Sequence, residues 1–140
     1  MKELTLPAAR ENIPAVIDFV NRELKSVGCP MKTEAQIDIA IDELYSNIAN
    51  YGYDGENGRV LVRLETVSRP RAVTISFIDE GRPFNPLERE DPDVSLPARE
   101  RKIGGLGIFM VKKSMDKVSY EYKDGHNVLT IEKKLEAITE

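Results

Sequence analysis

Hydrophobic residues recur at helical spacing in some parts of the chain and alternate with polar residues in others. The helical spacing covers residues 13–27, 33–53 and 104–115. The alternation predicts strands over residues 2–6, 59–67, 72–79, 117–123 and 127–135. Strands clustered in hairpins indicate an α+β two-layer sandwich, with a mixed, mainly antiparallel sheet covered on one face by helices.

The stretch from Asp38 to Tyr53 predicts the helix around which the other elements are organised. Its apolar residues recur at i, i+4, i+7 and i+11, which makes one buried stripe: Ile37, Ile41, Leu44 and Ile48. Glu43 and Asn47 project together from a flank beside that stripe, where they can reach a half-buried pocket. A solvated polar face is the alternative.

The ends of two helices have recognisable signals. Gly28-Cys29-Pro30 is expected to stop the first helix, because glycine followed by proline is typical of a helix C-terminus. Thr33 to Gln36 reads as a capping box that starts the central helix, and Gly52 is expected to stop it. In the third helical stretch, Met110 and Met115 are interpreted as core residues.

Length and charge restrict the function classes. A chain of 140 residues is expected to form a single domain over residues 1–140, and a net charge of −4 gives no reason to expect nucleic-acid binding. No apolar run approaches the roughly 20 residues of a membrane helix. The N-terminal residues have no apolar h-region, so we expect no secretory signal and a cytoplasmic protein. The single cysteine, Cys29, excludes an intrachain disulfide, and the single histidine, His126, argues against histidine-rich metal sites.

Two glycine-containing motifs flank a long segment without apolar periodicity. Asp79-Glu80-Gly81 ends a strand, where a carboxylate can accept a hydrogen bond from an exocyclic amine and a glycine lets a flat ring approach; an ordinary turn is the alternative. Residues 82–103 contain several prolines and many charges, which favours either a lid or a passive surface loop. Gly104 to Gly107 then open a helix, where backbone N–H groups can bind an anion, although a tight turn would look the same.

The central helix adds acid–base and metal chemistry. Asn47 offers a neutral oxygen to Mg²⁺, which keeps most of its waters when phosphates share it. Glu43, one turn earlier, could act as general base toward a hydroxyl nucleophile in phosphoryl transfer. Arg99, Arg101 and Lys102 could contribute charge to phosphate binding, or they could form a solvated run.

These motifs, in this order, resemble those of the GHKL ATPases, which include gyrase, histidine kinases and the mismatch-repair ATPase. Glu43-Leu-Tyr-Ser-Asn47 resembles the N-box, Asp79-Glu-Gly81 the first glycine box and Gly104-Gly-Leu-Gly107 the second. The length and the segments DELYSNIANYGY, DEGRPF and GGLGIFMVKK are similar to the stand-alone anti-sigma-factor serine/threonine kinases of bacterial partner-switching systems. The resemblance extends from Leu4 to Leu135.

The resemblance implies a Bergerat ATP-binding fold, with Mg²⁺ and ATP as cofactors and residues 82–103 as the ATP lid. It implies that Glu43 is the catalytic base, Asn47 the Mg²⁺ ligand and Asp79 the adenine anchor, with Gly81 beside the adenine. The phosphate cradle would consist of Gly104, Gly105, Leu106 and Gly107. Members of this family phosphorylate a small anti-sigma-factor antagonist and sequester a sigma factor, often as homodimers.

Some positions depart from the family pattern. Tyr51 stands where a histidine is frequent, Ile48 where a small residue is frequent, and Arg82 where many superfamily members have a second glycine. The Gly-Thr pair common near the end of the superfamily domain is replaced by His126-Asn127-Val128, so no adenine contact is assigned to Thr130.

Three functional hypotheses remain at the level of sequence. The first is a protein serine/threonine kinase, and the second is a non-catalytic ATP-binding switch that captures a regulatory partner. The third, the catalytic fragment of a histidine kinase, is disfavoured because the chain has no phosphoacceptor helix pair and its one histidine lies in a hairpin turn.

Overall fold

The structure is a computed structural model that describes residues 1–52, 58–68, 71–88 and 106–135. Its helices are α1 (Ile13–Ser26), α2 (Met31–Asn47) and α3 (Leu106–Ser114). Its strands are β1 (Lys2–Pro7), β2 (Arg59–Ser68), β3 (Arg71–Asp79), β4 (Lys117–Lys123) and β5 (His126–Lys134). Short 3₁₀ turns cover Arg10–Asn12 (η1) and Pro86–Glu88 (η3), and a π-helical turn covers Ile48–Gly52 (η2).

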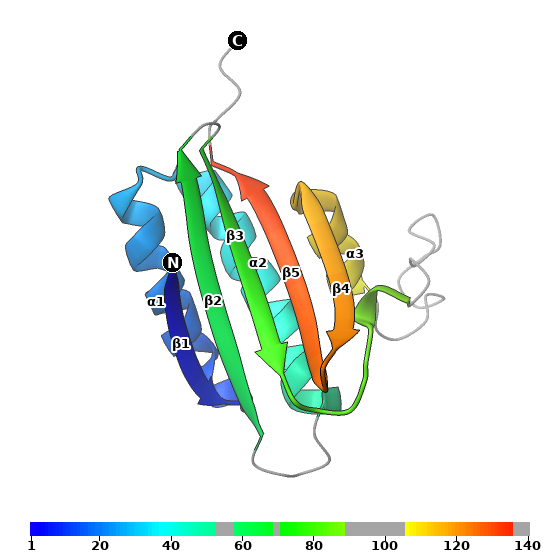
Figure 1. The fold of residues 1–140 in the computed structure, drawn as a ribbon. Coiled ribbons are helices and arrows are strands. Elements are labelled where there is room, and N and C mark those ends of the chain that lie inside the picture. The colour runs from blue at the N-terminus through cyan, green and yellow to red at the C-terminus, as the bar shows by residue number, and fades with distance from the viewer. Residues whose placement is uncertain (53–57, 69–70, 89–105, 136–140) are drawn as a thin grey trace.

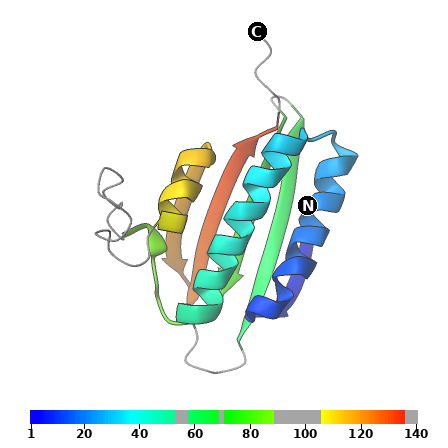
Figure 2. The same ribbon diagram turned by 180° about the vertical axis from the view of Figure 1, so that it is seen from behind.

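The strands form one sheet in the order β1-β2-β3-β5-β4, and every neighbouring pair is antiparallel. The helices lie together on one face of this sheet, with α2 between α1 and α3 (Figures 1 and 2). The α+β two-layer sandwich predicted from the sequence is therefore confirmed. The strand expected at the N-terminus is present as β1, which lies at an edge of the sheet beside β2.

The core lies between the helices and the sheet. Alternate residues of the central strands point toward the helices, and the apolar stripes of α1 and α2 cover them. Members of this core that are fully buried include Val20, Leu24, Ile37, Ile41, Leu44, Val62, Ile75 and Phe77. The buried stripe expected along the central helix is thus present, and it anchors α2 across the middle of the sheet.

The predicted stop of the first helix is confirmed in its geometry. Gly28 has φ of +73°, the left-handed conformation that side chains disfavour. The Cys29 N–H donates to the Leu24 carbonyl at 2.9 Å, and the Gly28 N–H donates to the Lys25 carbonyl at 3.2 Å. This pair of hydrogen bonds is the Schellman motif, which satisfies carbonyls that the end of a helix leaves free.

The predicted start of the central helix is wrong. Helix α2 begins at Met31, its N-cap is Pro30 in extended conformation, and no side chain caps it. Thr33 therefore lies inside the first turn, and the capping box does not form. The Pro30 carbonyl accepts the Glu34 N–H at 3.0 Å, so the helix starts directly after the proline that follows α1.

The end of the central helix also differs from the prediction. Regular α-helix stops at Asn47, and the chain continues as the π-helical turn η2 to Gly52; Tyr53 lies outside the described residues. Single π turns within helices are frequent at functional sites. Here the turn carries Gly52 toward the end of β3.

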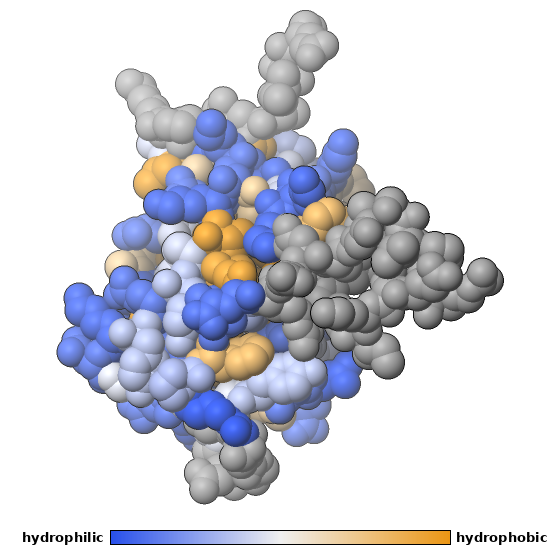
Figure 3. Space-filling model, turned by 90° about the vertical axis from the view of Figure 1, so that its right-hand side faces the viewer, coloured by the Kyte–Doolittle hydropathy of each residue, from blue (hydrophilic) through white to orange (hydrophobic). Residues whose placement is uncertain are grey.

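Two further expectations concern the α3 side of the molecule. Met115 is buried as predicted, but Met110 is 51% exposed, so its assignment to the core is wrong. Figure 3 shows hydrophobic side chains reaching the surface on this side. Most of the segment interpreted as a lid, residues 89–103, lies outside the described part of the chain. None of the described helices combines the length and apolar character needed to cross a bilayer.

Candidate nucleotide site

A pocket opens where the end of α2 meets the ends of β3 and β5. It is lined by residues from α2, η2, β3, the segment after β3, β4 and β5: Asn47, Ile48, Gly52, Asp79, Phe84, Pro86, Tyr120, Asn127 and Leu129. Its wall is mostly apolar and contains a few polar groups, which is the usual composition of a small-molecule site. Asn47 and Asp79, both singled out from the sequence, lie in this wall.

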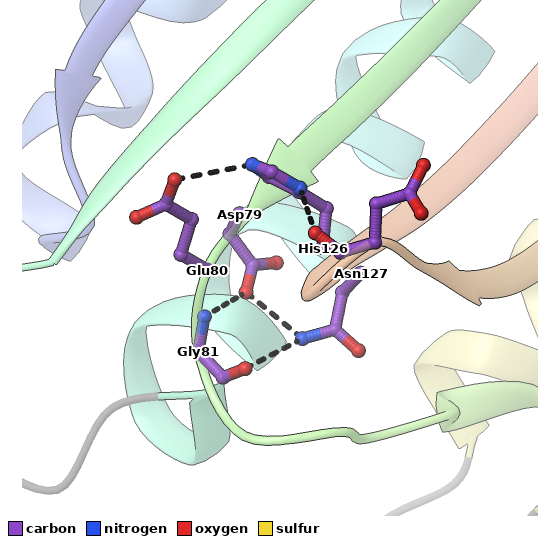
Figure 4. A network of polar contacts seen from close by, with 6 residues as sticks. Asp79, Glu80, Gly81, His126 and Asn127 are labelled. Carbon is purple, nitrogen blue, oxygen red and sulfur yellow. Dashed lines mark hydrogen bonds and ion pairs between the residues drawn. The ribbon is translucent and has the colours of Figure 1, made fainter.

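Asp79 is the last residue of β3 and is only 4% exposed. Its Oδ1 accepts the Gly81 N–H at 2.8 Å and an Asn127 Nδ2–H at 3.0 Å (Figure 4). Burial raises the pKa of the Asp79 carboxyl, while these hydrogen bonds and the nearby His126 lower it and only partly offset the burial. The site therefore holds a carboxylate whose charge is costly until a donor binds it.

Gly81 is packed too closely for any larger residue. A Cβ at this position would overlap the Gly52 carbonyl oxygen and would lie 2.9 Å from Asp79 Oδ1. The next residue, Arg82, donates its N–H to the same Gly52 carbonyl at 2.9 Å. The π turn after α2 and the segment after β3 are thus held together, which builds one wall of the pocket.

Glu43 and Asn47 lie one turn apart on α2 and contact each other, as the i, i+4 spacing predicts. Asn47 Nδ2 donates to the Glu43 carbonyl at 2.7 Å and to Glu43 Oε1 at 3.1 Å. Both amide hydrogens are therefore used, and Asn47 Oδ1 accepts no hydrogen bond from the described residues. This oxygen is a neutral, hard ligand of the type that suits Mg²⁺.

The first turn of α3 faces Glu43 of α2. A Cβ added to Gly107 would overlap the carboxylate of Glu43, so the absence of a side chain at Gly107 makes room for that carboxylate. Of the predicted phosphate cradle, Gly107 is described in full and Leu106 opens α3, whereas Gly104 and Gly105 lie outside the described residues.

The described residues do not form a metal site from side chains alone. Within the described ranges, no group of three or more His, Cys, Asp or Glu residues could hold a metal ion. A single Asn47 oxygen matches the way Mg²⁺ binds through one or two protein ligands together with substrate phosphates. The donor set therefore fits Mg²⁺ that arrives with a nucleotide.

Sequence reasoning missed Asn127, which is 4% exposed and contacts Asp79 directly. It also missed Tyr120 and Phe84, which hydrogen bond to the Asn127 side chain. One signal was present in the sequence. Asn127 shares a strand face with Leu129 and Ile131, so it is a polar residue on an otherwise apolar face next to a hairpin turn.

The chain matches a family model described as the histidine kinase-like ATPase domain over residues 6–133. Among curated proteins, it is 29% identical to the serine-protein kinase RsbW of Halalkalibacterium halodurans over 127 residues, covering 88% of this chain and 76% of the relative. The RsbW serine-protein kinase of Listeria monocytogenes is 27% identical over 131 residues, covering 90% of this chain and 82% of the relative.

Solved structures show the same fold at lower identity. The RsbU and RsbW domains of a Mycobacterium tuberculosis protein match with a TM-score of 0.65 and 18% identity, covering 96% of this chain. The histidine kinase domain of an Erythrobacter litoralis blue-light-activated histidine kinase matches with a TM-score of 0.58 and 15% identity, covering 93% of this chain. The chain spans 33% of the first structure and 62% of the second.

Proposed function

The chain belongs to the family of histidine kinase-like ATPase domains, and we propose that it is a Mg²⁺-ATP-dependent serine/threonine protein kinase. In this proposal it phosphorylates a small anti-sigma-factor antagonist and sequesters a sigma factor or a similar regulator. The relatives named serine-protein kinase RsbW support the kinase assignment.

The observation that carries the proposal is the contact of Glu43 with both Asn47 and Gly107. A carboxylate is held at 3.1 Å from the Asn47 amide and directly beside the first turn of α3. Helix N-termini favour anions such as phosphates, because free N–H groups and the helix dipole point toward them. A nucleotide with its phosphates at this turn would bring its terminal phosphate near Glu43.

Each residue then has a defined task. Asp79 would accept a hydrogen bond from the exocyclic amine of adenine, and Asn47 Oδ1 would hold Mg²⁺, which would neutralise phosphate charge. Glu43 accepts the proton of a serine or threonine hydroxyl as that oxygen bonds to the γ-phosphorus. The bond from the γ-phosphorus to the β–γ bridging oxygen breaks, and ADP leaves.

Phosphate transfer to purified anti-sigma-factor antagonists tests this function, with γ-labelled ATP as donor. Glu43→Gln should abolish transfer and leave ATP binding by calorimetry within about threefold of the wild type, since the amide keeps the shape of the side chain but cannot take a proton. Asp42→Asn is the matched control, because Asp42 is the neighbouring, exposed carboxylate on the same helix. It should leave both transfer and binding unchanged.

The non-catalytic switch is the competing outcome of the same experiment. A wild type that binds Mg²⁺-ATP and captures its partner, with no labelled acceptor and no effect of Glu43→Gln, would contradict the kinase proposal. Absence of ATP binding by the wild type at any magnesium concentration would contradict the nucleotide site itself.

A further inference from the structure

Asn127 lies at the centre of the polar network beside the pocket, and nothing in the sequence motifs assigns it a role. We propose that Asn127 is a positioning residue, which fixes the orientation of Asp79 and thereby sets the preference for a 6-amino over a 6-oxo purine. The inference rests on the proposed nucleotide site, but it does not require that the chain transfers phosphate.

The side chain of Asn127 has its hydrogen-bonding capacity fully used. Its Nδ2 donates to Asp79 Oδ1 at 3.0 Å and lies 3.3 Å and 2.9 Å from the carbonyl oxygens of Gly81 and Arg82. Its Oδ1 accepts the Phe84 N–H at 3.2 Å and the Tyr120 hydroxyl. A flip of the Asn127 amide would place Oδ1 against three hydrogen-bond acceptors, so the network permits only one orientation.

This fixed amide determines which oxygen of Asp79 is free. The described residues make two hydrogen bonds to the Asp79 carboxylate, from Gly81 and from Asn127, and both go to Oδ1 (Figure 4). Oδ2 is left as an acceptor for a bound base. Without Asn127, the Gly81 N–H would be the one remaining donor to the carboxylate among the described residues, and the carboxylate could then rotate about its last side-chain bond.

A fixed acceptor discriminates between purines by a simple rule. A carboxylate oxygen attracts the 6-amino group of adenine and repels the 6-oxo group of hypoxanthine. Placing two acceptors against each other in a buried site costs a large part of the binding free energy. A carboxylate that can rotate loses part of this contrast, because it can avoid the repulsion. Asn127 also holds the Gly81 and Arg82 carbonyls and the Phe84 N–H, so the same amide ties the base site to the first residues of the predicted lid.

The test compares the dissociation constants of Mg²⁺-ATP and Mg²⁺-ITP, measured by calorimetry on the full chain. Asn127→Ala should weaken ATP binding about tenfold or more, since a hydrogen bond that orients a charged group is lost. It should weaken ITP binding less, so that the preference for ATP falls. Thr130→Val is the matched control, because it removes the 3.0 Å Ser76–Thr130 bond between the same two strands on the opposite face of the sheet. It should leave the preference unchanged.

A second variant protects the test against misfolding. Tyr120→Phe removes the hydroxyl that Asn127 Oδ1 accepts and keeps the ring, so a partial loss of the ATP preference is expected. Equal changes in the dissociation constants of ATP and ITP for Asn127→Ala would overturn the inference. If Asn127→Ala does not fold, an unchanged preference for ATP over ITP in Tyr120→Phe would overturn it. A wild type that binds neither nucleotide would contradict the proposed nucleotide site. A wild type that binds ATP, with variants that keep its preference for ATP over ITP, would contradict only the role proposed for Asn127.

Discussion

At the scale of single residues, Asp79 carries a buried charge that is costly to the fold, and in the proposed function it binds a ligand. Its carboxylate is buried, and the two hydrogen bonds that it accepts from the described part of the chain both go to Oδ1. A buried charge with an unused oxygen is unfavourable in the free protein and becomes favourable when a donor binds. Residues of this kind are expected at binding sites, because the cost is recovered only in the complex.

Asp79→Asn should separate binding from stability. The asparagine can keep both existing hydrogen bonds through its own oxygen, so the fold should be preserved and the free energy of unfolding at neutral pH should rise. Its NH₂ group would face the adenine amine, and ATP binding should weaken roughly a hundredfold. Thermal unfolding and calorimetry measure the two effects. A variant that loses stability and binding together would show that the charge itself supports the fold.

The raised pKa of the Asp79 carboxyl also predicts a pH dependence. Between the ordinary pKa of an aspartate and the raised one, the folded state binds more protons than the unfolded state, so stability should fall as the pH rises through this window. ATP affinity should change in the opposite sense and fall as the pH is lowered, because a protonated Asp79 must lose its proton to accept the amine. In Asp79→Asn, the free energy of unfolding and the ATP dissociation constant should both depend less on pH than in the wild type.

At the scale of elements, the predictions were correct where the structure of a helix or strand depends on its own residues alone. The strands were predicted within about a residue of their observed ends, because alternation is a property of each strand alone. The capping box was wrong, since Pro30 starts α2 before Thr33 could cap it. The π turn at Ile48–Gly52 has no local signal, and its Gly52 is held by contacts with Gly81 and Arg82 from the segment after β3.

The contact between α2 and α3 supports a prediction at this scale. Gly107→Ala should displace the Glu43 carboxylate, which is the flexible end of a side chain, while alanine should favour the helix by up to about 1 kcal/mol. Phosphate transfer should therefore fall by about tenfold to a hundredfold, as for a misplaced catalytic group, with no loss of thermal stability.

The ATP affinity of Gly107→Ala, measured with and without Glu43, shows whether the substitution also acts directly on the phosphates. In a Glu43→Ala background the added methyl group meets no carboxylate, so Gly107→Ala should leave ATP affinity unchanged. If the ATP dissociation constant rises equally with and without Glu43, Gly107 contacts the phosphates directly, as the resemblance implies, and the positioning effect would be excluded.

At the scale of the whole molecule, the fold class followed from the sequence but the strand order did not. The hairpins β2–β3 and β4–β5 are local pairings that short turns predict. The pairing of β3 with β5 joins segments far apart in the sequence, and it alone sets Asp79 opposite Asn127. The missed site residue and the unpredicted strand order therefore have one cause, which is that neighbours across a sheet are not visible in a linear pattern.

The same long-range pairing predicts how the molecule responds to its ligand. The pocket is lined by α2, β3, β4 and β5, so a bound nucleotide would contact most of the sheet and the helix across it. At a free Mg²⁺-ATP concentration of a hundred times the dissociation constant, stability should rise by about 2.7 kcal/mol and the melting temperature by roughly 10 °C. Asp79→Asn should show little of this increase at the same concentration.

Hydrogen exchange resolves whether that stabilisation is shared by the entire chain. If the domain unfolds as one unit, buried amides of β2 should exchange about a hundredfold more slowly with nucleotide, although β2 lines no part of the pocket, since they exchange only on global unfolding. Amides of the exposed end of β1 should be unaffected, because local fraying does not require release of the ligand. Protection confined to α2, β3, β4 and β5 would show instead that β1, β2 and α1 unfold separately from the site.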